Sequence, residues 1–88
     1  MKGQHLRLVV GNAKGVHSRV AMRLAEILAE YAVTLQIIRG DETADCASIL
    51  DVLALALVQG TEIELQASGE KAGQALLAAQ KVVLQSDL

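Results

Sequence analysis

The stretch Thr61-Glu62-Ile63-Glu64-Leu65-Gln66-Ala67 alternates polar and apolar side chains more clearly than any other part of the chain. Successive side chains of a strand point to opposite faces, so this pattern predicts a β-strand with one face buried and the other in water. Gly60 precedes the stretch and Ser68-Gly69 follows it, which predicts a turn at each end. A sheet with one covered face and one open face is therefore expected.

Three further strands and three helices are predicted around this strand. Alternating or β-branched residues predict strands over 5–10, 33–38 and, more weakly, 42–47. Apolar residues at helical spacing predict helices over 18–30, 48–57 and from 70 onward, with Ser18 and Ser48 as N-caps. The order β-α-β-β-α-β-α predicts an α+β fold, in which a four-stranded antiparallel sheet is covered on one face by three helices.

The composition is that of a single small domain, residues 1–88, with an aliphatic core. Hydrophobic residues make up 52% of the chain and Tyr31 is its single aromatic residue, which argues against recognition of bases or sugars by stacking. No apolar run approaches the roughly 20 residues that span a bilayer, so no membrane insertion is expected. Cys46 is the single cysteine and no signal peptide is recognisable. These features predict a soluble protein of the reducing cytoplasm.

Charge is distributed unevenly along the chain. The first 25 residues carry five basic side chains and no carboxylate, whereas all ten acidic residues lie from Glu26 onward. This positive segment predicts an anion or an acidic protein surface as partner, and it is too sparse for a nucleic-acid stripe. His5, His17 and Cys46 are too few and too scattered for a metal site, so neither a metal nor a cofactor is predicted.

The stretch Lys14-Gly15-Val16-His17-Ser18-Arg19 places a histidine just ahead of a predicted helix. The first amides of a helix have no internal acceptor, and the helix dipole adds about half a positive charge there, so an anion binds readily. A neutral imidazole nitrogen is a competent nucleophile toward phosphorus. Ser18 offers a hydroxyl, and Arg19 offers a forked cation suited to phosphate oxygens. We therefore predict that His17 accepts and passes on a phosphoryl group; a solvated or capping histidine is the plainer interpretation.

The motif Gly15-Val16-His17-Ser18-Arg19-Val20-Ala21 resembles Gly-Leu-His-Thr-Arg-Pro-Ala, the active-site motif of HPr, the histidine-containing phosphocarrier of the bacterial phosphotransferase system (PTS). Ser48-Ile49-Leu50 stands where Gram-positive members carry a regulatory serine. Leu57-Val58-Gln59-Gly60-Thr61 resembles the turn before the family's last strand. The resemblance covers essentially all 88 residues and implies the open-faced β-sandwich of HPr.

The resemblance implies a metal-free, monomeric relay protein rather than a free-standing enzyme. Enzyme I, charged by phosphoenolpyruvate, would phosphorylate His17 on Nδ1, and the group would pass to an enzyme IIA domain in sugar uptake or its regulation. Arg19 would act as the assisting cation, and the amides around Ser18 and Arg19 would bind the phosphate. Val20 replaces the family's proline, which is expected to change the transfer rate and partner preference. Lys14 replaces a common asparagine and raises the local positive charge.

Docking of enzyme I and enzyme IIA is predicted over the first helix, the loop before it and the second helix. The residues expected to contact these partners are Lys14, Val20, Arg23, Ile49, Leu50 and Leu53. The three aliphatic residues of the second helix have a core position as their alternative. Ser48 has two interpretations, a plain N-cap or a phosphorylation site of an HPr kinase/phosphorylase.

Two other functions stand as alternatives. A regulatory HPr paralogue would act by protein binding, with phosphorylation of Ser48 as its switch. A nucleic-acid-binding α+β module would use the basic N-terminal quarter. The net charge of −2 and the lack of clustered lysines argue against this module.

Overall fold

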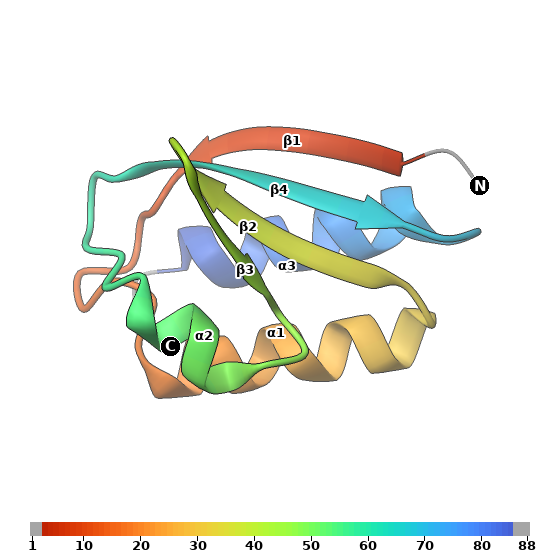
Figure 1. The fold of residues 1–88 in the computed structure, drawn as a ribbon, viewed down its shortest axis with the longest axis horizontal. Coiled ribbons are helices and arrows are strands. Elements are labelled where there is room, and N and C mark those ends of the chain that lie inside the picture. The colour runs from red at the N-terminus through yellow and green to blue at the C-terminus, as the bar shows by residue number, and fades with distance from the viewer. Residues whose placement is uncertain (1–2, 86–88) are drawn as a thin grey trace.

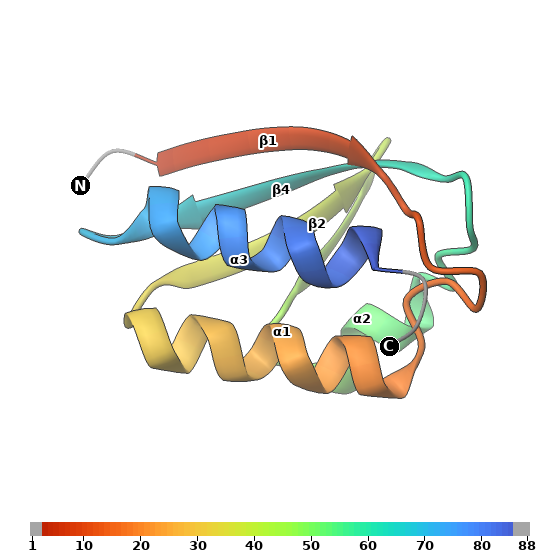
Figure 2. The same cartoon turned by 180° about the vertical axis from the view of Figure 1, so that it is seen from behind.

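The structure, a computed structural model, describes residues 3–85. Its elements are β1 (Gly3–Val9), α1 (Ser18–Tyr31), β2 (Thr34–Arg39), β3 (Glu42–Asp45), α2 (Ile49–Ala54), β4 (Glu62–Ser68) and α3 (Ala72–Leu84). The four strands form one antiparallel sheet in the order β1-β4-β2-β3. All three helices lie on one face of this sheet and the other face is open, as Figure 1 and Figure 2 show from opposite sides. The predicted element order and layers are confirmed.

The strand with the clearest alternation, β4, lies at the centre of the sheet. It pairs with β1 on one side and with β2 on the other, so Leu65 lies opposite both Leu6 and Ile37. The buried side chains of β4 are Ile63, Leu65 and Ala67, at every second position. The side chains between them are more exposed and point away from the helices. One strand with this alternation therefore defines both faces of the sheet.

The aliphatic stripes of α1 and α3 close the core against the sheet. The two helices lie side by side and pack against each other, and α2 packs against α1 (Figure 2). The buried residues of these two stripes are Val20, Ala21, Leu24 and Ile27 from α1, and Ala72, Ala75, Leu76, Ala79, Val82 and Val83 from α3. Burial of this aliphatic surface is the main stabilising contribution available to a core that contains no aromatic ring.

Two elements are shorter than predicted. The second helix ends at Ala54 instead of Leu57, because Ala56 takes a left-handed φ of 52° that a continuing helix does not allow. The third strand ends at Asp45 instead of Ala47, because the Asp45 side chain accepts a hydrogen bond from the Ala47 amide (2.9 Å) and turns the chain. The bounds of the other elements lie within one or two residues of the prediction.

Gly15 is the point where the loop before α1 crosses the segment after α2. Its φ is 70°, and a Cβ at this position would lie 2.1 Å from the Leu57 carbonyl oxygen. The same oxygen accepts a hydrogen bond from the Val16 amide at 2.9 Å. A side chain at this position would therefore both strain the backbone and displace the neighbouring main chain.

We expect Gly15→Ala to lower the free energy of unfolding by about 3 kcal/mol or more, because a left-handed alanine costs about 1–2 kcal/mol before the clash with Leu57 is added. Gly40→Ala is the matched control: its φ is 58°, but a Cβ there meets nothing within 4 Å. The control should lose only about 1 kcal/mol. Urea denaturation of both variants measures the difference, and equal losses would contradict the close crossing.

Candidate functional site

The loop between β1 and α1 is tied to two other parts of the chain, the end of α3 and the segment between α2 and β4. The Gly11 amide donates to the Val83 carbonyl at the end of α3 (3.1 Å), and the Gln59 side-chain amide donates to the Gly11 carbonyl (3.2 Å). The Val16 amide donates to Leu57, as described above. This loop is therefore held at both of its ends before the chain reaches His17.

His17 is the N-cap of α1. Its backbone is extended (φ −88°, ψ −176°), and its Nδ1 atom accepts a hydrogen bond from the Arg19 amide at 3.3 Å. The prediction that Ser18 is the cap was wrong by one position: Ser18 is the first helical residue, because the His17 side chain caps the helix by accepting from the Arg19 amide, two residues further on. The imidazole nitrogen and the first amides of the helix thus lie together.

The start of α1 carries no carboxylate in its first turn. The Ser18 and Arg19 side chains are both exposed there, and His17 is partly exposed. In α2, by contrast, Asp51 lies in the first turn and offsets the helix dipole. The first turn of α1 therefore presents amides, a hydroxyl and a guanidinium to the surface around one imidazole, which favours a bound anion.

The predicted docking residues of the loop and α1 are placed differently from one another. Lys14 is exposed in the loop. Arg23 is partly exposed and pairs with Glu26 (3.2 Å) and with Glu30 (4.0 Å). Val20 corrects the prediction: its side chain is completely buried in the core, because it points inward on the stripe that packs beneath the sheet. It has no side-chain surface to offer a partner.

Of the three predicted docking residues of α2, one leucine is exposed and the other two residues are partly buried. Leu50 is 78% exposed, whereas Ile49 and Leu53 are partly buried and pack against the core. Two further aliphatic side chains, Met22 on α1 and Val58 after α2, are also mostly exposed. These two were not predicted from the sequence, because their positions alone do not distinguish an exposed apolar residue from a core residue.

Ser48 is the N-cap of α2, as predicted. Its hydroxyl oxygen accepts a hydrogen bond from the Asp51 amide (3.3 Å), and its own amide donates to the Asp45 carbonyl (2.9 Å). Asp45 and Asp51 are exposed on either side of it. The local field around this hydroxyl is therefore negative, unlike the field at the start of α1.

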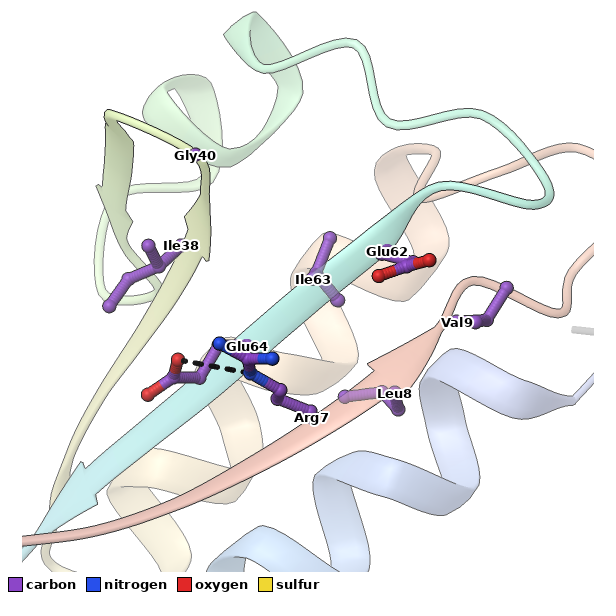
Figure 3. A pocket seen from close by; sticks show the side chains of 8 residues that line it. All are labelled: Arg7, Leu8, Val9, Ile38, Gly40, Glu62, Ile63 and Glu64. Carbon is purple, nitrogen blue, oxygen red and sulfur yellow. Dashed lines mark ion pairs between the residues drawn. The ribbon is translucent and has the colours of Figure 1, made fainter.

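A hollow of the surface lies elsewhere, on the open face of the sheet. It encloses about 500 Å³ beside β1 and β4, and Figure 3 shows Arg7 facing Glu64 across it (Nε to Oε1, 4.0 Å). Glu64 also pairs with His5 (3.1 Å). None of the lining residues belongs to the loop or helix that carries His17. The hollow is thus not part of the site.

Other reactive groups do not form a second centre within residues 3–85. Burial raises the pKa of the Cys46 thiol to about 12, and the nearby Asp45 charge adds to the shift. The thiol therefore stays protonated and is a poor nucleophile. In this described range, no three His, Cys, Asp or Glu side chains come together as metal ligands. None of the helices within the same range is long and apolar enough to cross a membrane.

The chain is similar in sequence to a family model and to known phosphocarrier proteins. The family model described as "PTS HPr component phosphorylation site" matches residues 5–85. Phosphocarrier protein HPr of Mycoplasma capricolum is 31% identical over 80 residues, which cover 91% of this chain and 90% of that protein. Phosphocarrier protein NPr of Shewanella violacea is 33% identical over 70 residues, which cover 80% of this chain and 77% of that protein. Relatives of both names therefore resemble the chain to a similar degree.

The fold is also similar to that of solved structures of phosphocarrier proteins. The crystal structure of a phosphocarrier protein HPr from Bacillus anthracis superposes with a TM-score of 0.86, covering 94% of this chain and 99% of that chain. The sequence identity of this pair is 23%, so the match concerns the fold alone. The predicted open-faced arrangement of sheet and helices is confirmed by it.

The capping role of His17 can be tested by stability alone. We expect His17→Ala to lower the free energy of unfolding by about 1 kcal/mol, because the Arg19 amide loses its acceptor. His17→Asn keeps a side-chain oxygen for that amide and should lose clearly less. Urea unfolding midpoints compare the two variants, and identical midpoints would show that the imidazole does not cap the helix.

Proposed function

The chain belongs to the HPr family of phosphocarrier proteins of the phosphotransferase system, and from that membership we propose that His17 accepts a phosphoryl group from phosphorylated enzyme I and donates it to enzyme IIA domains. A phosphocarrier is a relay component, consumed and regenerated, rather than an enzyme. The observation that carries the assignment to His17 is the 3.3 Å approach of its Nδ1 to the Arg19 amide. Sugar uptake or its regulation is the process in which we expect the relay to act, in the cytoplasm.

The bond to the Arg19 amide prepares Nδ1 for the reaction. A nitrogen that accepts this hydrogen bond carries a lone pair and no proton, so the ring proton of the neutral imidazole lies on Nε2. During transfer, this lone pair forms the new N–P bond while the bond between phosphorus and the donor breaks, and the electron pair of the broken bond stays with the donor. The return step reverses these roles with the enzyme IIA acceptor.

The surroundings of Nδ1 supply stabilisation for the arriving charge. When phosphorus takes the place of the hydrogen-bonded proton at Nδ1, the phosphoryl oxygens become acceptors for the Arg19 amide and its neighbours in the first turn. Ser18 and Arg19, both exposed in this turn, can add a hydroxyl and a guanidinium as donors. Fixed donors aimed at developing charge are an effective form of catalysis for phosphoryl transfer, because they need no reorganisation.

Acidic partner surfaces fit the face that carries this site. Lys14 and Arg19 are exposed around His17, and Arg23 lies one turn further along α1. Leu50 adds an exposed apolar contact on α2, which packs against α1. We propose that enzyme I and enzyme IIA dock on this face, with basic residues guiding approach and Leu50 providing apolar burial.

Incubation of the protein with enzyme I of the same organism, phosphoenolpyruvate and Mg²⁺ should add the mass of one phosphoryl group, and acid should remove it. His17→Ala should stay unmodified. His5→Ala is the matched control and should be phosphorylated like the wild type, because His5 lies on the open face of the sheet and pairs with Glu64. A gain of mass that persists in His17→Ala would end the proposal.

A regulatory role of Ser48 is the second candidate function, and we propose it because its hydroxyl is partly exposed at the start of α2, on the docking face. A phosphate on this hydroxyl would add negative charge between Asp45 and Asp51. Such charge would repel an acidic partner. In a regulatory paralogue, this repulsion would switch protein binding rather than phosphoryl transfer.

Ser48→Asp and Ser48→Asn isolate the effect of charge, because both side chains can cap the helix and they differ by one negative charge. We expect Ser48→Asp to slow phosphorylation of His17 by enzyme I several-fold and Ser48→Asn to leave it within about twofold of the wild-type rate. Rates are measured by quenched-flow labelling from phosphoenolpyruvate. Equal rates in the two variants would remove the charge switch and leave Ser48 as a cap only.

A further inference from the structure

Asn12 is the buried polar side chain of the described residues. It is only 1% exposed, and among residues 3–85 no other polar or charged residue is buried to this degree. It lies in the loop between β1 and α1, five residues before His17. Burying an amide is unfavourable unless hydrogen bonds compensate for the lost water, so its bonds indicate what holds it there.

Asn12 fixes the turn that leads to the site. Its side-chain Oδ1 accepts a hydrogen bond from the Lys14 amide at 2.8 Å. Its main-chain oxygen accepts a second bond from the Gly15 amide, also at 2.8 Å. The first of these bonds closes an Asx turn and the second closes a backbone turn over the same residues. Two successive amides of this turn, those of Lys14 and Gly15, therefore both donate hydrogen bonds to oxygen atoms of Asn12.

The turn continues into the bonds that hold His17. The Val16 amide, next along the chain, donates to Leu57, and the His17 imidazole then accepts from Arg19. Between Asn12 and the helix, the amides of Lys14, Gly15 and Val16 are thus all engaged. A shift of the Lys14–Gly15 turn would be passed directly to the residue that begins α1.

The amide nitrogen of Asn12 shows which half of the side chain matters. Nδ2 is buried and has no hydrogen-bond partner among residues 3–85. A buried donor left unpaired costs about 1–3 kcal/mol, so the group opposes stability. Unfavourable groups of this kind persist mainly where function requires the surrounding geometry. The oxygen, which holds Lys14, is the half that the loop uses.

We propose that Asn12 is a positioning residue for phosphoryl transfer: its Oδ1 holds the Lys14–Gly15 turn so that the His17 imidazole lies over the first amides of α1. The inference rests on the proposed role of His17 as acceptor. Asn12 does not touch the phosphoryl group and acts through the loop. Its contribution is therefore to the rate of transfer within the docked complex, because the buried Asn12 side chain contacts no partner and its substitution leaves the exposed Lys14 side chain in the chain.

Asn12→Ala and Asn12→Ser test the acceptor oxygen. Alanine removes it, and we expect the rate at saturating phosphorylated enzyme I to fall about tenfold with KM within about twofold of wild type, since small misplacements of a reacting group have effects of this size. Serine restores a neutral oxygen that forms the same turn more weakly, and its rate should lie between alanine and wild type. Gln66→Ala removes an amide from the open face of the sheet and serves as control.

A second measurement separates positioning from loss of fold and does not require phosphoryl transfer. The Arg19 amide resonance reports its bond to His17, and in ¹⁵N–¹H spectra it should shift in Asn12→Ala, shift less in Asn12→Ser and stay in place in Gln66→Ala. All rates and spectra are taken below the unfolding transition of each variant.

The outcomes distinguish this proposal from the proposed function. If the wild type is not phosphorylated on His17, the acceptor role fails, and the Arg19 resonance alone decides whether Asn12 positions the imidazole. If the wild type is phosphorylated but Asn12→Ala transfers at the wild-type rate, or loses only KM, the positioning role is overturned. An unchanged Arg19 resonance in Asn12→Ala overturns it as well.

Discussion

The contact between the main chains at Gly15 and Leu57 is the constraint on which the site depends. The Leu57 oxygen occupies the space where a Cβ of residue 15 would lie, and it accepts the Val16 amide. One carbonyl group therefore joins the segment after α2 to the residue just before the N-cap of α1. Because the same segment follows the short α2, this crossing joins the end of α2 to the start of α1, in addition to the direct packing of the two helices.

This crossing makes a helix start available for chemistry. A serine, threonine, asparagine or aspartate oxygen is the preferred acceptor for one of the first amides of a helix. Here the cap is an imidazole, a group that can exchange its hydrogen bond for a bond to phosphorus. In the proposed relay, phosphoryl oxygens take over the amides that Nδ1 leaves. In this proposal the first amides of α1 have an acceptor both before and after His17 is phosphorylated. Transfer in either direction therefore leaves no amide of this turn unpaired in the interface with the partner.

Sequence patterns predicted the fold well because the sheet and the helices bury one face each. The alternation of β4 and the apolar stripes of α1 and α3 are repeated over several residues, so single exceptions do not alter them. The candidate site was predicted from Gly15 and His17, whose residue types are restricted by a positive φ and by chemistry. Burial of Asn12 was not predicted, because it depends on which segments of the folded chain cover this position. The cap was misplaced by one residue for a related reason, since a histidine acts as N-cap only where the loop turns its ring toward the amide.

The position of Val20 shows what the departure from the family motif changes in the first turn of α1. The backbone ladder of α1 begins with the bond from the Ala21 amide to the His17 carbonyl at 3.0 Å, so the Val20 amide precedes it. Proline at this position would remove an amide that the helix itself does not use, and a buried proline would fill much of the same apolar space. Valine keeps the buried contact and leaves one more amide in the first turn. Valine in place of proline therefore makes the backbone less rigid and adds one amide donor near His17. We expect this change to affect the binding of an anion at the start of α1 rather than the packing of the core.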